Sequence, residues 1–151
     1  VLLLASNGRE EAELVVERIV QAVAMGRAPD EIAVLCRIKR HMDHVGFALR
    51  RRGIDFQSMS APGFRAFDWK RPSVKLLTLH SAKGLEFPLV AVVGLDAMPV
   101  PDQSMDEEVR LLYVGMTRAT HELVLSAAGT SPMVRRVQNS LEAVAQQFGT
   151  A

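Results

Sequence analysis

The sequence lacks most of the features that would place a protein outside the ordinary globular classes. Its single cysteine, Cys36, excludes an intramolecular disulfide and a cysteine-based zinc site, and it suits the reducing cytoplasm, where we expect the protein to be located. No apolar run approaches the roughly 18 residues of a membrane span. The first residues lack the basic start and the long apolar stretch of a signal peptide.

Net charge is nearly absent as well. The chain has 18 Lys and Arg residues against 17 Asp and Glu residues, which leaves a net charge of +1. Bulk charge therefore gives no argument for a nucleic-acid or membrane partner. The 151 residues, of which 48% are hydrophobic, suffice for one domain with a substantial core. The chain does not begin with methionine, and we expect it to be part of a longer protein.

Several motifs of catalysis and metal binding are also missing. No G-x-x-x-x-G-K-S/T phosphate loop occurs, and no Asp-Glu pair follows an apolar strand as a magnesium site would require. Cys36 has no base beside it in the sequence, so we interpret it as a packing residue. His41 and His44, three apart on a predicted helix, are typical of a surface. We predict no metal site, because no metal-binding pattern occurs among His41, His44, His80 and His121.

What the sequence contains is a regular alternation of short apolar runs and amphipathic stretches. The pattern predicts strands at residues 1–5, 32–35, 74–79, 89–95 and 122–126, and helices at residues 9–25, 39–52, 106–119 and 132–148. This order is typical of an α/β domain whose mostly parallel sheet carries helices on both faces. The segment 89–95 is the most hydrophobic and predicts a central strand buried on both faces. Residues 55–73 have no clear period and predict a long connection.

The first unusual segment lies between two predicted strands, at residues 78–87. It reads Thr-Leu-His-Ser-Ala-Lys-Gly-Leu-Glu-Phe and concentrates polar side chains where ligands of open α/β sheets bind. Backbone N–H groups around Gly84, with a lysine and hydroxyls nearby, suit phosphate oxygens. The plainer interpretation, a polar turn with Gly84 as a helix cap, stays open on these residues alone.

The second unusual segment is the predicted helix that ends at Arg118. A helical wheel places Arg118 opposite the apolar stripe of this helix, which consists of Met105, Val109, Leu112, Tyr113 and Met116. An arginine in this position can face a partner, or it can be a solvated side chain that interacts with the helix dipole. A third and weaker signal is Arg37, at the carboxyl end of a buried strand, where a guanidinium can hold an anion through two hydrogen bonds.

Together these segments resemble the C-terminal part of superfamily 1 DNA helicases of the UvrD/Rep type. Residues 78–88 are similar to motif V of that family, residues 107–119 to motif VI and residues 32–37 to motif IV. The resemblance covers about residues 1–128. It implies that residues 1–151 are the second RecA-like domain of a larger protein, a three-layer sandwich, and that residues 55–73 stand where family members carry a large insertion.

The resemblance also implies a role in ATP hydrolysis for four residues. Arg118 is expected to be the arginine finger, and Arg37 a second arginine that reaches the γ-phosphate. Glu86 is expected to hydrogen-bond the ribose, and Gly84 to lie close to the phosphates. ATP and Mg²⁺ would be held mainly by an N-terminal RecA-like domain of the same parent chain.

A second group of residues is expected to face DNA. By the same resemblance, the backbone of single-stranded DNA would be contacted by Thr78, His80, Ser81 and Lys83. The motif V segment would then meet the nucleotide at Glu86 and the DNA near Thr78, which makes it the natural element to couple hydrolysis to stepping along the strand.

The chain departs from the family pattern in two places. The aromatic residue that usually precedes the motif IV arginine and stacks on adenine is replaced by Cys36, so stacking is weaker or comes from elsewhere. The large insertion between motifs IV and V is missing, and only residues 55–73 stand there. The second departure bears on duplex unwinding more than on ATP hydrolysis and translocation.

We therefore predict the C-terminal motor domain of an ATP-dependent DNA helicase or translocase that moves 3′ to 5′ on single-stranded or duplex DNA. The chain alone is predicted to be inactive, because it has no phosphate loop. Two alternatives stay open: a degenerate RecA-like module that binds DNA or protein without motor activity, and a nuclease or repair subunit that uses this fold as a scaffold. No metal-binding carboxylate cluster favours the latter, since we interpret as a loop and a helix start the acidic residues Asp102, Asp106, Glu107 and Glu108.

Overall fold

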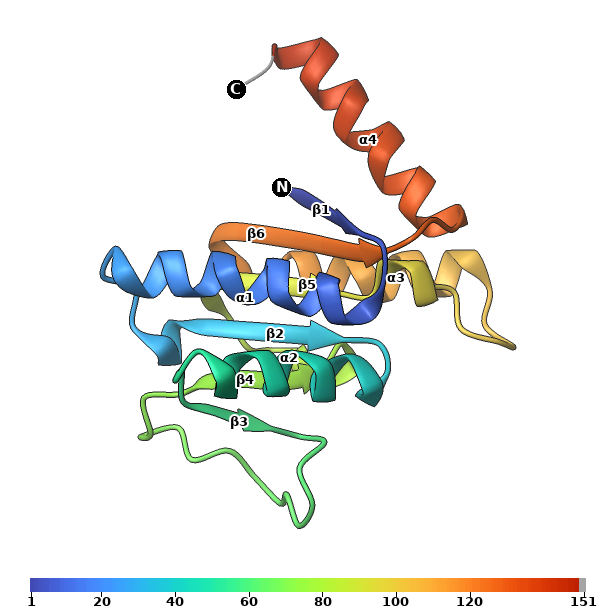
Figure 1. Cartoon of the computed structure of the whole chain (residues 1–151). Coiled ribbons are helices and arrows are strands. Elements are labelled where there is room, and N and C mark those ends of the chain that lie inside the picture. Colours follow the sequence, from blue (N-terminus) through green and yellow to red (C-terminus); the bar gives the residue numbers. More distant parts are fainter. Residues whose placement is uncertain (150–151) are drawn as a thin grey trace.

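The computed structural model describes residues 1–149 and contains a single sheet of six parallel strands (Figure 1). The strand order is β1-β6-β5-β2-β4-β3, and every neighbouring pair is parallel. The strands are β1 (Leu2–Ala5), β2 (Ile32–Cys36), β3 (Phe56–Ser58), β4 (Val74–Thr78), β5 (Phe87–Val93) and β6 (Ala119–Ala128). The predicted parallel sheet is confirmed. The prediction missed β3, an edge strand too short to show a period, inside the segment expected to be a connection.

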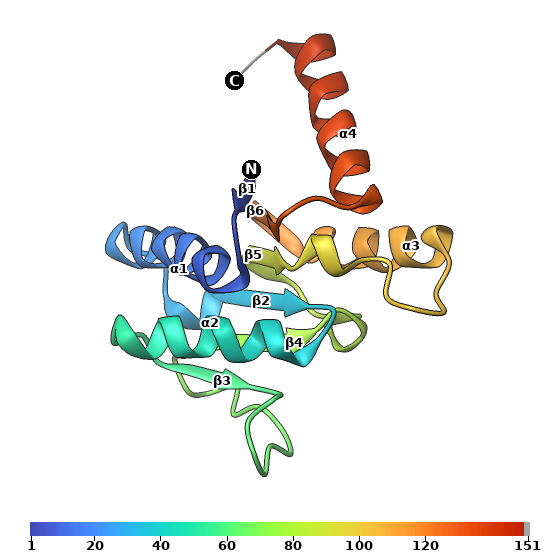
Figure 2. The same cartoon turned by 45° about the vertical axis from the view of Figure 1, so that its right-hand side comes forward.

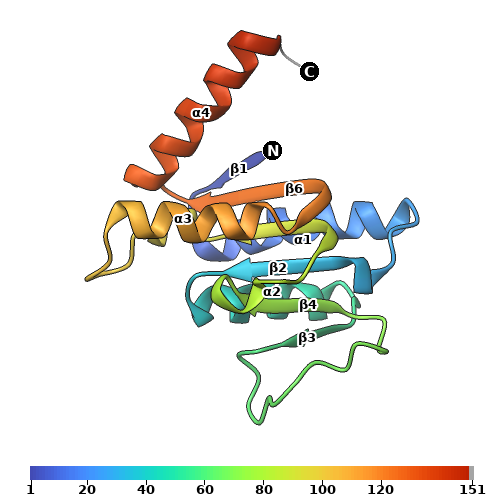
Figure 3. The ribbon, with the colours of Figure 1, turned by 180° about the vertical axis from the view of Figure 1, so that it is seen from behind.

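Helices cover both faces of this sheet. Helices α1 (Gly8–Ala24) and α2 (Lys39–Arg51) lie on one face, and α3 (Met105–Met116) lies on the other (Figures 1 and 3). This arrangement confirms the predicted α/β class with helices on both sides. None of the helices within residues 1–149 combines the length and the apolar character that crossing a bilayer requires.

Strand β5 is the centre of the core. Its side chains alternate between the two faces, so that Leu89 and Ala91 pack toward α1 and α2 while Val90 and Val92 pack toward α3. All four are buried. Strands β6 and β2 flank it on both sides, which is the position that its continuous apolar sequence predicts.

The helices begin at the polar residues that cap them. The Asn7 side chain accepts a hydrogen bond from the backbone N–H of Glu10 at 2.9 Å, and Ser104 accepts one from Glu107 at the start of α3. Ser131 does the same for Val134 in the first turn of the final helix. Each cap satisfies an N–H group that has no partner within its helix.

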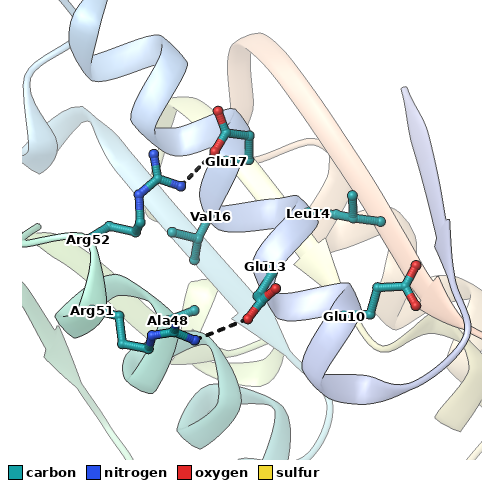
Figure 4. Close-up of a pocket in the computed structure, with 8 residues that line it drawn as sticks. All are labelled: Glu10, Glu13, Leu14, Val16, Glu17, Ala48, Arg51 and Arg52. Atoms are coloured by element: carbon teal, nitrogen blue, oxygen red, sulfur yellow. Dashed lines mark hydrogen bonds and ion pairs between the residues drawn. The ribbon is translucent and has the colours of Figure 1, made fainter.

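Helices α1 and α2 pack side by side and are joined at the surface by two ion pairs. Arg51 contacts Glu13 at 3.3 Å, and Arg52 contacts Glu17 at 2.6 Å, across a groove of about 370 Å³ with Val16 in its lining (Figure 4). Because these side chains are largely exposed, each pair contributes at most about 1 kcal/mol. None of the predicted site residues lines this groove.

The final helix, α4 (Pro132–Phe148), leaves the body of the domain (Figures 1 and 2). Val134 and Val137 are buried, but the apolar stripe continues into exposed positions as far as Phe148. Because α4 turns away, it leaves Tyr113 of α3 uncovered, and this side chain is 67% exposed. The helical wheel placed both Leu112 and Tyr113 on the buried stripe of α3. This prediction is correct for Leu112, which is buried, and wrong for Tyr113.

A buried carboxylate joins α1 to the carboxyl ends of β5 and β6. One Glu11 oxygen accepts hydrogen bonds from Ser126 Oγ at 2.7 Å and from the Gly94 backbone N–H at 2.8 Å, while its other oxygen has no partner. Burial raises the pKa of Glu11. His41 is buried nearby against Gly94, where a Cβ atom would overlap its ring, so the expected surface position is wrong for His41.

We predict that Glu11→Gln makes the stability of the chain less sensitive to pH. A carboxyl group whose pKa is raised by folding stabilises the folded state below the ordinary carboxylate range, and this contribution is lost as the pH rises through the raised value. Between pH 4 and 8, the melting temperature of the wild type should therefore fall relative to that of Glu11→Gln. Thermal unfolding followed by circular dichroism across this range measures the difference.

The matched control is Glu13→Gln, on the exposed face of the same helix. Its melting curve should follow that of the wild type across the pH range. Parallel curves for the wild type and Glu11→Gln would contradict the prediction.

Candidate functional site

The parallel sheet divides the predicted site residues between its two edges. Thr78 ends β4 and pairs with Cys36, so it lies at the carboxyl edge. Arg118 directly precedes β6, and Glu86 directly precedes β5, so both lie at the amino edge. Phe87 pairs with Ala119 in the sheet, which places Glu86 and Arg118 side by side.

Arg118 occupies the turn between α3 and β6. Its Nε donates to the Val114 carbonyl at 3.1 Å, and its Nη1 donates to the Leu85 carbonyl at 3.3 Å. Its own carbonyl accepts a hydrogen bond from the Phe87 backbone N–H at 2.9 Å. These contacts join the end of the motif VI segment to the end of the motif V segment.

The position of Arg118 differs from the helical wheel in one respect. The helix ends at Met116 and Thr117 is its C-cap, so Arg118 is no longer helical and the wheel does not set its direction. Its guanidinium is half-buried and contacts a carbonyl of the last turn, where the helix dipole favours a cation. In this structure the contacts of Arg118 are therefore those of a side chain that interacts with the helix dipole, the second of the two interpretations that its sequence position allows.

Glu86 and Gly84 complete the amino edge. The Glu86 side chain is exposed, and Gly84 is exposed with a φ of +82°, a conformation that favours glycine. Apart from Gly84 itself and its two chain neighbours, no residue lies within 4 Å of the place that a Cβ atom of Gly84 would occupy, so a ligand can approach this backbone closely. An exposed carboxylate and a guanidinium next to an open backbone fit the hydroxyl groups and phosphates of a nucleotide.

The segment that connects the two edges packs tightly against α3. Residues 79–86 lead from the carboxyl end of β4 to the amino end of β5, and Leu79 at their start is buried. Gly115 of α3 faces Leu79, and a Cβ atom at position 115 would overlap Leu79 Cδ2. Glycine therefore allows α3 to approach this segment at a distance that no other residue permits.

The residues expected to face DNA gather at the carboxyl edge. Thr78 Oγ1 is 2.8 Å from Ser81 Oγ and accepts the Ser81 backbone N–H at 3.2 Å, which fixes the turn that follows β4. His80, Ser81 and Lys83 are exposed in and directly after this turn. The structure thus brings the four predicted residues together on one accessible turn.

The structure does not bring Arg37 to the amino edge. Arg37 follows Cys36, which pairs with Val93 at the far end of β5, so the length of β5, about 20 Å, separates it from Arg118. The arrangement within this chain does not support two arginines acting on one phosphate. Only Arg118 enters the nucleotide site proposed below.

Arg37 instead forms an ion pair with Glu108, which the sequence suggested only as one of the acidic residues at the start of a helix. Its Nε lies 3.1 Å from both oxygens of Glu108, whose side chain is 1% exposed, and the Arg37 side chain is 17% exposed. Glu108 also accepts the Val100 backbone N–H at 3.2 Å. One signal could have revealed this role, since Glu108 lies four residues before the buried Leu112 and so on the inner side of α3.

The interpretation of Cys36 can also be compared with the structure. Cys36 is fully buried in β2, as its interpretation as a packing residue requires, and burial raises the pKa of its thiol. Within residues 1–149, no group of three or more His, Cys, Asp or Glu side chains is arranged to hold a metal ion.

The chain is similar in sequence to DNA helicases. Residues 58–130 match the family described as the UvrD-like helicase C-terminal domain. DNA helicase II of Escherichia coli is 47% identical over 70 residues, and the match covers 42% of this chain and 10% of that protein. The ATP-dependent DNA helicase Rep of E. coli is 51% identical over 59 residues, or 35% of this chain and 9% of that protein. The matched part thus spans about a tenth of the length of these relatives.

Solved structures extend the similarity to most of the chain. The C-terminal domain of a possible DNA helicase from Lactobacillus plantarum superposes with a TM-score of 0.69 and 28% identity, covering 93% of this chain and 81% of that one. The C-terminal part of the Fun30 ATPase domain, at 12% identity and a TM-score of 0.50, shares the fold. Residues 58–130, which include both edges of the site, thus match the family described as the UvrD-like helicase C-terminal domain.

Proposed function

We propose that this chain is the second motor domain of an ATP-dependent DNA helicase or translocase that moves 3′ to 5′. The observation that carries the proposal is the contact of Arg118 with the Leu85 carbonyl, beside Glu86, at an accessible edge of the sheet. In this proposal a separate N-terminal RecA-like domain of the same parent supplies the phosphate loop and holds Mg²⁺. The cytoplasmic location expected from the sequence stays a prediction.

Arg118 acts in this proposal by exchanging its partners. Its Nε and Nη1 now donate to two neutral carbonyls, Val114 O and Leu85 O. A γ-phosphate brought close by the other domain offers charged oxygens, whose hydrogen bonds to a guanidinium are shorter and roughly twice as strong as those to neutral acceptors. Because the side chain is already near the surface, the exchange requires only a local rotation, and it places positive charge where negative charge develops during hydrolysis.

The same exchange links the nucleotide to the DNA edge. Release of the Leu85 carbonyl frees the end of the 79–86 segment, which begins directly after Thr78 at the opposite edge. Leu79 is packed on Gly115 of α3, so this segment and the helix that ends near Arg118 move as neighbours. A tightly packed core transmits such displacements rather than absorbing them. This segment is therefore the proposed coupling element between hydrolysis and stepping.

The carboxyl edge is the proposed DNA surface. Its turn presents the hydroxyl groups of Thr78 and Ser81 together with His80 and Lys83, all of which can contact phosphate oxygens. With few basic residues, the grip on the backbone is weak, which suits a protein that must release and rebind DNA at each step.

We predict that Arg118→Ala removes hydrolysis but retains ATP binding. The protein to be measured joins this chain to its phosphate-loop domain. The loss of turnover should be about 10³–10⁵-fold, the effect of an arginine finger in comparable enzymes. Steady-state ATPase rates and equilibrium nucleotide binding are the measurements, with Arg118→Lys as the variant that keeps the charge but loses the planar fork. Equal losses of binding and turnover would contradict the finger role.

The chain by itself should show no ATP turnover, because its sequence contains no phosphate loop. A coupled phosphate-release assay on the purified chain tests this. Turnover that disappears in the Arg118→Ala variant of the same preparation would refute the prediction, and would show that this domain has a complete active site of its own.

We predict that Lys83→Ala weakens binding to single-stranded DNA and reduces its dependence on salt. Loss of one phosphate contact should lower the slope of log K against log salt concentration by about 0.7. Fluorescence anisotropy with a labelled oligothymidine at several KCl concentrations measures both quantities. Lys70→Ala removes an exposed lysine from the segment before β4 and should leave the slope unchanged. The same slope in both variants would argue for a module that does not bind DNA at this edge.

A further inference from the structure

The final helix, α4, carries an apolar stripe that the domain covers only in part. Its members are Val134, Val137, Leu141, Val144 and Phe148. The first two are buried in the core on the α3 side of the sheet, whereas the last three are 42%, 54% and 76% exposed. Figures 1 and 2 show the reason, because α4 rises away from the sheet after its first turns. The outer half of the helix therefore offers an apolar surface to another protein segment.

The spacing of this stripe is that of a coiled-coil seam. Successive members are three, four, three and four residues apart, which is the seven-residue repeat of helices that pack along one another. A helix that only covers a globular core usually carries a broader apolar stripe. The narrow repeat begins in the core and continues without a break into the exposed half, so this half has the pattern of a helix that pairs with a second helix.

The positions that flank the exposed part of the seam carry no charge. They are occupied by Gln138, Ser140, Ala145 and Gln147. The charged side chains of α4, two arginines and one glutamate, stand at other positions of the repeat. Flanking charges select the partner in coiled coils, and like charges there keep identical helices apart. Because the flanks are neutral, two identical α4 helices meet no repulsion, and a different partner gains no selective charge pair.

The exposed seam is also symmetric along the helix. From Val137 to Phe148 the steps are four, three and four residues, so the pattern of apolar positions is the same in both directions. Two copies of α4 that lie antiparallel, related by a twofold axis through the middle of this segment, therefore place every apolar position opposite another apolar position. A contact of this kind uses the same surface on both partners, as twofold dimers do.

We propose that α4 pairs with the α4 helix of a second copy of this chain, antiparallel and about a twofold axis. In this arrangement Leu141 of each copy faces Val144 of the other, and Phe148 faces Val137. Val137 lines a mostly apolar groove of about 170 Å³ between α3 and α4. The most exposed side chain of the seam thus enters the groove of the other copy, and the twofold axis makes the same contact twice.

The groove offers the inserted ring an aromatic partner. Tyr113 of α3 lies in its lining and is largely exposed, and Met116 lies in the same lining. A phenyl ring gains from edge-to-face contact with a tyrosine and from contact with a thioether. Insertion of Phe148 would therefore cover, in one contact, two of the most exposed apolar side chains of the domain.

Sedimentation equilibrium of the chain tests the pairing. Because the exposed seam is short, we expect a weak dimer, with a dissociation constant between roughly 1 µM and 1 mM. Val144→Glu places an unpaired charge in the apolar contact and should raise this constant at least about tenfold. Gln146→Glu adds the same charge at an exposed position outside the seam and should dimerise as the wild type does. Circular dichroism shows whether each variant is folded.

Two results would overturn the proposal. One is a chain that stays monomeric up to about 1 mM, the upper end of the expected range. The other is the same dissociation constant for folded Val144→Glu and folded Gln146→Glu. Arg118→Ala should leave dimerisation unchanged, because the pairing does not depend on the proposed nucleotide site.

Cross-linking tests the direction of the pairing. Leu141→Cys and Val144→Cys are purified separately, mixed and oxidised. An antiparallel pair places the two new thiols next to each other, so the disulfide-linked dimer should contain one copy of each variant, which mass spectrometry distinguishes. The native thiol of Cys36 is fully buried and should not compete. Dimers that link each variant mainly to itself would indicate parallel helices and overturn the proposal.

Two other occupants of the seam give different results. If a helix of the parent protein covers the seam, the protein that joins this chain to its phosphate-loop domain is monomeric even where the chain alone dimerises. If the seam lies on a membrane surface, the chain binds lipid vesicles and Val144→Glu abolishes this binding. Either result would overturn the proposal, which expects the longer protein to dimerise and Val144→Glu to make it monomeric.

Discussion

The proposed nucleotide site of this domain depends on one hydrogen bond, from the Arg118 guanidinium to the Leu85 carbonyl. It joins the turn after α3 to the end of the 79–86 segment, and the Phe87 N–H returns a bond to the Arg118 carbonyl. The acceptor is a neutral carbonyl, so a charged ligand can compete for the guanidinium.

The parallel sheet explains how a contact at Leu85 can affect the opposite edge of the domain. In a parallel sheet all strands end at the same edge, so a segment that joins two consecutive strands must return along the full length of the strands, and the segment from β4 to β5 also passes β2, which lies between them. The 79–86 segment makes this passage with only a short 3₁₀ turn, His80–Ala82, instead of a long helix. A displacement at Leu85 therefore has few residues over which to dissipate before it reaches Thr78.

Most of the architecture could be predicted from the sequence, because long periodic segments such as α1 and the continuous apolar run of β5 bury one defined face each. The contacts made by the predicted site residues were harder to predict from the sequence. Helix α3 ends two residues before Arg118, and the periodicity of the sequence does not mark this boundary. The ion pair of Arg37 with Glu108 could not be predicted because it joins residues far apart in the chain.

The close approach of Gly115 to Leu79 has a consequence for how such a domain can vary. The spacing between α3 and the 79–86 segment is set by the absence of a Cβ atom at Gly115, a position that bears no charge. A single methyl group there would wedge the two apart while leaving every polar group in the chain unchanged. In the proposed mechanism, a substitution at Gly115 would therefore disturb the coupling between the amino and carboxyl edges by steric overlap alone.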